Sequence, residues 1–256
     1  MSSTKLPKRT TTLLIDADLY LYRAAAGAEE QIDWGDDLFS LATDLKVAKK
    51  TFIEQLDSFK TELGADEAIL CFSDRENFRK QIDPEYKSNR KKTRKPVGFA
   101  ELIQWAKGQY THIQKPGLEG DDCMGILATG ELYKDCSIIV SDDKDMRSVP
   151  CKLYRPSDDI MYTISEKEAD AFFLTQCLTG DSADGYSGIP GIGPKKAEAI
   201  LGARPDWSLV EAAYIKHNMT RDDAIRMARL ARILRISDWD SKANKHILWE
   251  PRRAEK

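Results

Sequence analysis

The sequence is poor in the residues that build zinc sites, disulfide frameworks and membrane spans. Its three histidines lie far apart, and its five cysteines are an odd number without a Cys-x-x-Cys pair, which argues against zinc and against disulfides. No segment approaches the roughly 18 apolar residues of a membrane-spanning helix, and the first 30 residues hold no apolar run of the signal-peptide kind. These absences predict a soluble, cytosolic protein with reduced thiols.

A strong excess of one charge is also missing, because 39 basic residues face 42 acidic ones and leave a net charge of −3. The balance conceals regions of opposite sign. Residues 75–96 hold nine basic and three acidic side chains, whereas residues 119–184 hold fifteen acidic and six basic ones. Since 256 residues with 41% hydrophobic content can bury a large core, these regions are expected to be functional surfaces of a folded protein.

Three short apolar runs are predicted to be buried parallel strands, because each is continuous rather than alternating. They are Leu13–Ile15, Ala68–Phe72 and Ile138–Val140. Helix-like segments at about 36–63 and 121–133 separate them, which indicates an α/β fold. Each run is followed by aspartate, and the carboxyl ends of parallel strands share one edge of a sheet. The alternative is that these aspartates only start turns or cap helices.

Nine carboxylates at such positions form the strongest candidate site. They are Asp16, Asp74, Glu119, Asp121, Asp122, Asp143, Asp145, Asp181 and Asp184. Oxygen ligands without histidine or cysteine favour magnesium or manganese, and nine carboxylates suffice for two ions. Two such ions are typical of in-line displacement at a phosphodiester, where they activate water and stabilise the developing charge.

A glycine-rich loop follows the helix predicted at about 166–178. Residues 187–197 set Gly188, Gly191 and Gly193 before an apolar helix that is expected to begin near Lys195 and Lys196. The pattern resembles a helix-hairpin-helix, in which glycine lets the backbone approach a phosphate. Such a loop reads no base, so it predicts contact with a nucleic-acid backbone without sequence preference.

Six motifs in order resemble the 5′ nuclease superfamily, which comprises the flap endonucleases and the 5′ to 3′ exonuclease domains of bacterial DNA polymerase I. The motifs are Ile-Asp16, Phe-Ser-Asp74, Tyr86-Lys87-Ser-Asn-Arg90, Glu119-Gly-Asp121-Asp122, Asp143-Lys-Asp145 and Gly-Asp181-Ser-Ala-Asp184 with the glycine loop. Residues 118–125 and 227–235 are most similar to the stand-alone exonucleases of T-seven-like bacteriophages. The resemblance therefore covers nearly the whole chain.

The resemblance implies one 5′ nuclease domain over residues 1–256. Its parts would be a SAF (PIN-like) α/β core with a mostly parallel sheet at about 12–165, a basic helical arch at about 75–115, and a helix-hairpin-helix with a helical C-terminal region at about 166–256. It also implies two Mg²⁺ ions per site, with Mn²⁺ as a substitute. One ion would draw on the carboxylates from Asp16 to Asp122, and the other on those from Asp143 to Asp184.

Further residue roles follow from the same resemblance. Lys87 and Arg90 would contact the scissile phosphate and offset charge in the transition state. Arg79 would contact DNA from the arch, and Tyr86 would stack on a base. Where many relatives have Asp-Gly after the first strand, this chain has Asp16-Ala-Asp18, so Asp18 is a candidate outer-sphere group.

The expected activity is a 5′ to 3′ exonuclease on duplex DNA, with 5′-phosphate products and without sequence specificity. Flapped DNA and RNA–DNA hybrids are further candidate substrates. A monomer in the cytoplasm, or in the host cytoplasm for a phage protein, is favoured, with roles in replication, primer removal, recombination or host DNA degradation. Asp143→Asn or Asp181→Asn is expected to abolish cleavage and to spare DNA binding.

Two other functions compete with this interpretation. Haloacid-dehalogenase-like phosphohydrolases use Asp-x-Asp after a first strand and a Gly-Asp-x-x-Asp motif, which Asp16-Ala-Asp18 and Gly180-Asp181-x-x-Asp184 imitate. That family has no use for the glycine loop or for the carboxylates at 119–122. A non-catalytic helix-hairpin-helix DNA-binding protein would use the loop but would leave nine carboxylates in repulsion.

Overall fold

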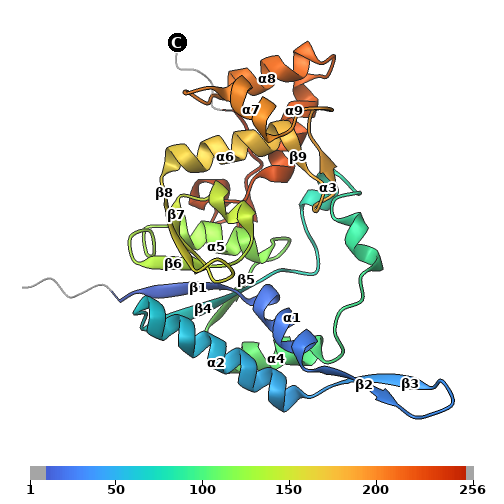
Figure 1. Cartoon of the computed structure of the whole chain (residues 1–256). Coiled ribbons are helices and arrows are strands. Elements are labelled where there is room, and N and C mark those ends of the chain that lie inside the picture. The colour runs from blue at the N-terminus through green and yellow to red at the C-terminus, as the bar shows by residue number, and fades with distance from the viewer. Residues whose placement is uncertain (1–9, 252–256) are drawn as a thin grey trace, which may run out of the picture.

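A six-stranded sheet forms the centre of the protein, whose computed structural model describes residues 10–251 apart from the side chains of Lys91 and Lys92. The strand order is β5-β4-β1-β6-β7-β8 (Figure 1). All neighbouring strands are parallel except β7 and β8, which are antiparallel. The strands are β1 Thr12–Asp16, β4 Glu67–Phe72, β5 His112–Gln114, β6 Ser137–Val140, β7 Cys151–Arg155 and β8 Ile160–Ile164.

The three predicted strands are confirmed as neighbours in this sheet. Leu14 of β1 pairs with Ile69 of β4 and with Ile139 of β6, and both pairings are parallel. Their carboxyl ends therefore lie side by side at one edge, as the sequence predicts. The α/β fold with a mostly parallel sheet is confirmed.

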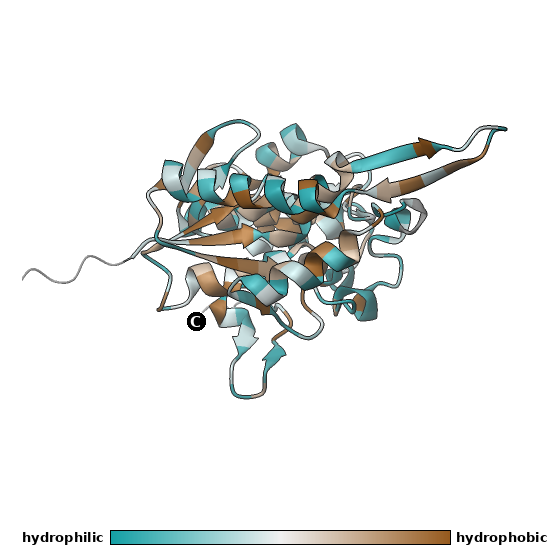
Figure 2. Cartoon of the chain, turned by 90° about the horizontal axis from the view of Figure 1, so that it is seen from below, coloured by the Kyte–Doolittle hydropathy of each residue, from teal (hydrophilic) through white to brown (hydrophobic). Residues whose placement is uncertain are grey.

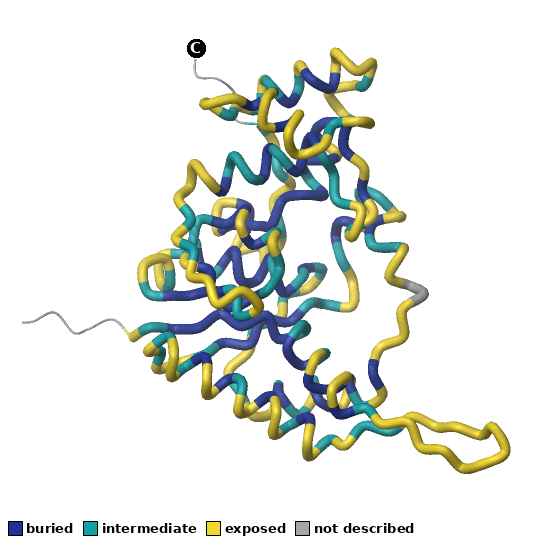
Figure 3. The backbone as a smooth tube through the Cα atoms, in the orientation of Figure 1, coloured by how far each residue is buried: buried dark blue, intermediate teal, exposed yellow. Residues whose placement is uncertain are grey.

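Alternate side chains of the central strands fill two separate cores. Leu13, Leu70 and Val140 pack with helices α1, α2 and α4, while Leu14 and Ile139 pack with α5 on the other face. The bounds are α1 Ala17–Gly27, α2 Leu45–Leu63, α4 Phe99–Gln109 and α5 Gly120–Thr129. Both faces of the central strands are covered, so their backbone is buried (Figure 3) and the strand ends are held rigidly.

The helix expected at 121–133 is confirmed as α5, but the one expected at 36–63 is wrong in its first third. Strands β2 Glu29–Asp33 and β3 Phe39–Thr43 form a hairpin there, and α2 begins only after Asp44, whose Oδ1 accepts a hydrogen bond from the backbone N–H of Lys46 at 2.8 Å. Residues 39–41, Phe-Ser-Leu, alternate between apolar and polar side chains, a short pattern that favours a strand. Figure 2 shows this hairpin extending away from the body of the protein.

The region after the sheet is helical and has its own hydrophobic core. The predicted helices at 166–178 and near Lys195 are confirmed as α6 and α7, and the helices pack around Leu178, Ala197 and Tyr214. The helices are α6 Glu166–Thr179, α7 Pro194–Leu201, α8 Trp207–Lys216 and α9 Arg221–Ala231, with short strands β9 Gly180–Asp181, β10 Tyr186–Ser187, β11 Trp239–Asp240 and β12 Lys245–His246. Within residues 10–251, no helix combines the length and the hydrophobicity needed to cross a membrane.

The basic segment 75–98 bridges the two parts of the molecule. The helical arch expected at about 75–115 is helical only in part, because residues 75–98 contain two short helices, α3 Arg79–Ile82 and η1 Ser88–Lys92, and are otherwise irregular, whereas α4 follows within the expected range (Figure 1). Near the middle of the segment, the backbone N–H of Lys87 donates to the carbonyl of Asp184 at 2.7 Å. Near its C-terminal end, the backbone N–H of Val97 donates to the carboxylate of Glu29 at 2.7 Å.

Candidate active site

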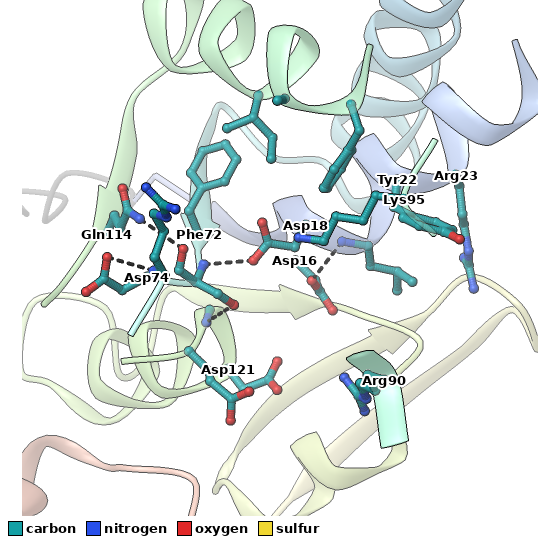
Figure 4. A pocket seen from close by; sticks show the side chains of 18 of the residues that line it. Asp16, Asp18, Tyr22, Arg23, Phe72, Asp74, Arg90, Lys95, Gln114 and Asp121 are labelled. Atoms are coloured by element: carbon teal, nitrogen blue, oxygen red, sulfur yellow. Dashed lines mark hydrogen bonds between the residues drawn. The ribbon is translucent and has the colours of Figure 1, made fainter. Parts of the chain in front are cut away.

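A cavity of about 900 Å³ opens at the carboxyl edge of the sheet. Its walls are the ends of β1, β4 and β6, the start of α5, the basic segment 75–98 and helix α4 (Figure 4). Seven carboxylates line it, which are Asp16, Asp18, Asp74, Glu119, Asp121, Asp142 and Asp143. The topology therefore brings together acidic residues that are up to 127 positions apart in the sequence.

Asp16 occupies the junction between β1 and α1 and is 9% exposed. One of its carboxylate oxygens accepts a hydrogen bond from the backbone N–H of Leu19 at 3.3 Å, and the other accepts from the hydroxyl of Ser141 at 2.7 Å. Burial raises the pKa of Asp16 to about 6, and the charges of Asp18 and Asp143 act in the same direction. Ser141 orients this carboxylate, a role that the sequence did not reveal.

Asp121 and Asp143 complete a group around Asp16. Burial raises the pKa of Asp121 well above its ordinary value, and the charges of Asp143 and Asp16 raise it further. Asp143 begins the turn after β6, where its Oδ1 accepts from the backbone N–H of Asp145 at 2.8 Å. Among the side chains that the structure describes, none forms an ion pair with Asp16, Asp121 or Asp143. We call these three the unpaired carboxylates.

Glu119 and Asp184 are each matched by a basic residue across the cavity. The ammonium of Lys87 contacts Glu119 and lies 3.4 Å from a carboxylate oxygen of Asp184, and Arg90 donates to the other oxygen of Asp184 at 2.6 Å. Although burial opposes it, the charges of Lys87 and Arg79 lower the pKa of Glu119 to about 2. The two basic residues predicted to bind the scissile phosphate thus lie at the cavity, held by carboxylates.

Asp145 and Asp181 are bridged by a single ammonium group. Lys144 Nζ donates to Asp145 at 2.8 Å and to Asp181 at 2.5 Å, and Gln176 donates to Asp145 at 2.7 Å. Burial raises the pKa of Asp145 to about 6, with the charge of Asp143 as the next cause. The bridging role of Lys144 was not predicted, although its place between two predicted ligands was a signal. We call Glu119, Asp184, Asp145 and Asp181 the paired carboxylates.

Two further predicted or candidate ligands take part in loop structure. Asp74 accepts from the backbone N–H groups of Arg75 and Gly117, both at 2.8 Å. Asp18 accepts from the backbone N–H of Ser73 at 2.7 Å. Both side chains line the cavity (Figure 4), so these bonds fix the loop after β4 beside the unpaired carboxylates.

The structure contradicts the assignment of Asp122 as a ligand and of Arg79 as a DNA contact. Asp122 is fully buried, and the guanidinium of Arg79, itself 2% exposed, donates to both of its carboxylate oxygens at 2.7 and 2.8 Å. Arg79 also donates to the carbonyl of Leu230 at 3.0 Å. The pair is a structural link between α5, α3 and the C-terminal region, because consecutive helical residues face different sides and only Asp121 points into the cavity.

The expected stacking of Tyr86 on a base is also wrong. Tyr86 is 2% exposed and its ring stacks on Tyr186 at a centroid distance of 6.3 Å. Its hydroxyl donates toward Glu119 at 3.0 Å and lies 3.1 Å from Asp184. Its role is to position these two carboxylates, and its ring is not available to a base.

The glycine loop connects α6 to α7 as expected, but its glycines differ in role. Gly188 is buried, and a side chain there would meet the carbonyl of Leu178 at 2.2 Å. That glycine is required by close packing, which contradicts a DNA contact. Gly191, with a φ of +77°, and Gly193 are exposed with open space around them. Lys195 and Lys196 are exposed beside them, so this tip remains a candidate backbone-binding surface.

The unpaired carboxylates fit a divalent cation by their chemistry. They provide only oxygen donors, they are partly or largely buried, and burial together with neighbouring carboxylate charge raises the pKa values of Asp16 and Asp121. Within residues 10–251, no group of three or more acidic, histidine or cysteine side chains is already arranged to coordinate a metal ion. The fit therefore rests on the donor set rather than on a preformed coordination shell.

Comparisons with known proteins identify the family of the chain. Residues 11–169 match the model of the 5′-3′ exonuclease N-terminal resolvase-like domain. The chain is 30% identical to the exodeoxyribonuclease of Enterobacteria phage T3, over 94% of this chain and 93% of that protein, and 29% identical to the exonuclease of Escherichia phage T7, over 93% of each. A flap endonuclease Xni of Vibrio campbellii is 29% identical over 74% of this chain and 80% of its own length.

Among solved structures, the T5 D15 protein co-crystallised with metal ions has a similar fold. The TM-score is 0.64 at 17% identity, and the match covers 87% of this chain and 89% of that chain. At this identity the likeness concerns the fold, including the helical region after the sheet.

Proposed function

The chain belongs to the 5′-3′ exonuclease family and is a nuclease, and from this premise we propose that it depends on divalent metal and degrades duplex DNA from the 5′ end with two Mg²⁺ ions. The observation that carries the proposal is the group of unpaired carboxylates, Asp16, Asp121 and Asp143, at the floor of a cavity under a basic segment. The paired carboxylates Asp145 and Asp181 are the proposed second group.

The bound ions would supply Lewis-acid stabilisation and activation of water. The residues of this chain would orient the carboxylates and bind the phosphate. Ser141 fixes the orientation of Asp16, and Lys87 and Arg90, which lie at the same cavity, would turn from their carboxylates toward the scissile phosphate and offset its charge. The proposed products carry a 5′-phosphate and leave a 3′-hydroxyl, and no protein nucleophile is involved.

The substrate is proposed to be held through its backbone. Exposed Gly191, Gly193, Lys195 and Lys196 at the α6–α7 loop would contact phosphates without reading bases. Flap cleavage and removal of RNA from RNA–DNA hybrids are included as further activities of the same site, and the protein is proposed to act as a monomer. Because two of the relatives come from bacteriophages, the proposed setting is the cytoplasm of an infected cell.

The test is product analysis with Mg²⁺ on duplex and flapped DNA labelled at the 5′ or the 3′ end. Mononucleotides released from the 5′ label, with a 3′-labelled strand that shortens progressively, are the expected result. A single short oligonucleotide from the flap would assign an endonuclease instead. Binding without any Mg²⁺-dependent product would overturn the proposal in favour of a non-catalytic DNA-binding protein.

A further inference from the structure

The hairpin of β2 and β3 projects from the body of the protein (Figure 2). Every residue from 30 to 41 is exposed, and none of the residues 29–43 belongs to one of the three hydrophobic cores of the described chain (Figure 3). The hairpin therefore adds little to the packing of the sheet or of the helical region. It is free to serve a function other than stabilising the fold.

The hairpin is ordered at its tip and at its root. Near the tip, the indole N–H of Trp34 donates to the hydroxyl of Ser40 at 2.9 Å. At the root, the carboxylate of Glu29 accepts two hydrogen bonds from the guanidinium of Arg94, at 2.5 and 2.8 Å. The surface of the hairpin is thus preformed, so a ligand that binds it has little ordering to impose.

Apolar side chains are exposed on both faces of the hairpin. It holds five of the fifteen exposed large apolar side chains of the described chain, at 37–65% exposure, and these are Ile32, Trp34, Leu38, Phe39 and Leu41. Ile32 pairs with Ser40, to which Trp34 is hydrogen bonded, so these side chains share one face. Phe39 and Leu41 flank Ser40 along β3 and lie on the other face. A cleft in a partner can cover both faces at once, whereas a flat surface cannot.

The charge of the hairpin is of one sign. Residues 29–43 hold five acidic side chains and no basic one. Arg94 neutralises Glu29. In the part of the chain that the structure describes, the other four form no ion pair, and these are Glu30, Asp33, Asp36 and Asp37. The exposed apolar side chains are therefore surrounded by uncompensated negative charge.

This charge distinguishes between the possible ligands of the hairpin. The phosphates of DNA and anionic lipid headgroups carry the same sign, so the hairpin repels them. A second copy of this chain that pairs hairpin to hairpin would bring two such acidic groups together. A protein that combines an apolar cleft with lysine or arginine at its rim complements both the apolar side chains and the charge.

We propose that the β2–β3 hairpin is a docking element for a separate protein, whose apolar cleft receives Trp34 and Leu38 and whose basic rim pairs with the carboxylates around them. No residue of 29–43 lines the carboxylate cavity, so the docking element is distinct from the candidate active site. The inference goes beyond the proposed nuclease function and does not depend on it. Arg94 at the root does line the cavity, so a docked protein would be held beside the bound DNA.

Photo-cross-linking identifies the partner, which then serves as the probe. In cells that naturally express the gene, p-benzoylphenylalanine replaces Leu38 of the full-length protein or, as a control, Leu132, which is 81% exposed and lies outside the hairpin. We expect one protein to cross-link from position 38 and not from position 132, and mass spectrometry identifies it for purification. Absence of such an adduct, or an adduct with a second copy of this chain, would overturn the proposal.

Direct binding of the purified partner tests the chemistry of the contact. Trp34→Ser/Leu38→Ser should weaken binding about 30-fold, as expected for loss of a central aromatic contact. Asp36→Asn/Asp37→Asn keeps the apolar side chains, and asparagine accommodates the positive φ of both positions. This variant should weaken binding about tenfold at low salt and less at high salt. Leu132→Ser should bind as wild type does, and unchanged binding of either double variant would overturn the proposal.

Cleavage and DNA affinity distinguish a docking element from a DNA contact. Trp34→Ser/Leu38→Ser should keep the wild-type kcat/KM on 5′-flapped duplex, the wild-type Kd for DNA and the wild-type Tm. Loss of DNA affinity in the folded variant would assign the hairpin to DNA and overturn the proposal. Absence of cleavage by wild type would instead overturn the proposed function, while binding of the purified partner would still decide on the hairpin.

Discussion

The unpaired and the paired carboxylates lie at one site but meet opposite electrostatic conditions. Asp16 and Asp121 are buried next to other carboxylates, and their pKa values are raised. Glu119, across the cavity, is buried to a similar degree but has Lys87 and Arg79 beside it, and its pKa is about 2. At Glu119 two neighbouring cations therefore outweigh burial, whereas at Asp145, whose ion-pair partner is Lys144, burial and the charge of Asp143 prevail and the pKa is raised to about 6.

This difference indicates that the paired carboxylates contribute mainly to folding stability and the unpaired ones mainly to catalysis. Paired carboxylates are compensated within the protein, so they hold the basic segment and the helical region against the core. Unpaired carboxylates repel one another, which costs folding free energy unless a divalent ion joins them. The unpaired carboxylates are therefore expected to contribute more to metal binding than the paired ones. Single substitutions in each set test this expectation.

The largest effect is expected from Asp143→Asn. Loss of one unpaired carboxylate removes a ligand that no lysine can replace, and we expect kcat/KM to fall about 10⁴-fold, which is about 5 kcal/mol. DNA affinity should be retained. The measurement is single-turnover cleavage of 5′-labelled duplex, with exposed Asp158→Asn as the control. Full activity of Asp143→Asn would show that the unpaired carboxylates are no more important for cleavage than the paired ones.

Arg79→Met is expected to destabilise the protein by about 3–5 kcal/mol, because it leaves Asp122 buried without its partner. Urea denaturation measures the change in the free energy of unfolding. The matched variant is Arg90→Met, whose side chain is 55% exposed in its ion pair and whose loss should cost about 1 kcal/mol or less. Equal stabilities would show that the buried pair is not a structural link.

Lys87→Met is expected to lower kcat/KM by about 10²–10³, the usual cost of losing one group that stabilises developing charge. The folded state should persist, because Tyr86 and Arg79 still contact Glu119. Lys80→Met, on the exposed side of α3, is the control. If both variants cleave as wild type does, Lys87 serves only to neutralise Glu119 and Asp184.

Asp181→Asn is expected to have the smallest effect, about tenfold on kcat/KM, or about 1.4 kcal/mol. The sequence alone predicted that this change abolishes cleavage, as for Asp143. The ion pair with Lys144 revises that expectation, because Asp181 is already compensated. Parallel assays of Asp181→Asn and Asp143→Asn compare the two losses of kcat/KM. Equal losses would show that both carboxylates contribute equally to cleavage.

The sheet edge was predictable, whereas the pairing within the site was not. Continuous apolar runs ending in aspartate predicted β1, β4 and β6 and hence the convergence of Asp16 and Asp143. Adjacent acidic residues such as Asp121 and Asp122 look alike in sequence, yet one faces the cavity and the other is buried. The partner of Asp122 lies 43 positions earlier, a distance at which no local pattern indicates a contact.

In some segments the local sequence pattern did not indicate the structure that forms. The hairpin at residues 29–43 was assigned in part to a helix because it adjoins the strongly helical α2, and its own alternation is short. Helix α1 follows β1 without a loop, since Asp16 ends the strand and caps the helix at once. Glycine positions were predicted correctly as a loop, but only packing distinguishes buried Gly188 from exposed Gly191.

The most direct test of the metal assignment is binding of Mn²⁺ in the absence of DNA, followed by electron paramagnetic resonance, for wild type, Asp121→Asn and the control Asp158→Asn. We predict saturable binding to wild type and to the control, and at least tenfold weaker binding to Asp121→Asn. Undiminished binding to Asp121→Asn would contradict the assignment of the unpaired carboxylates as the metal site.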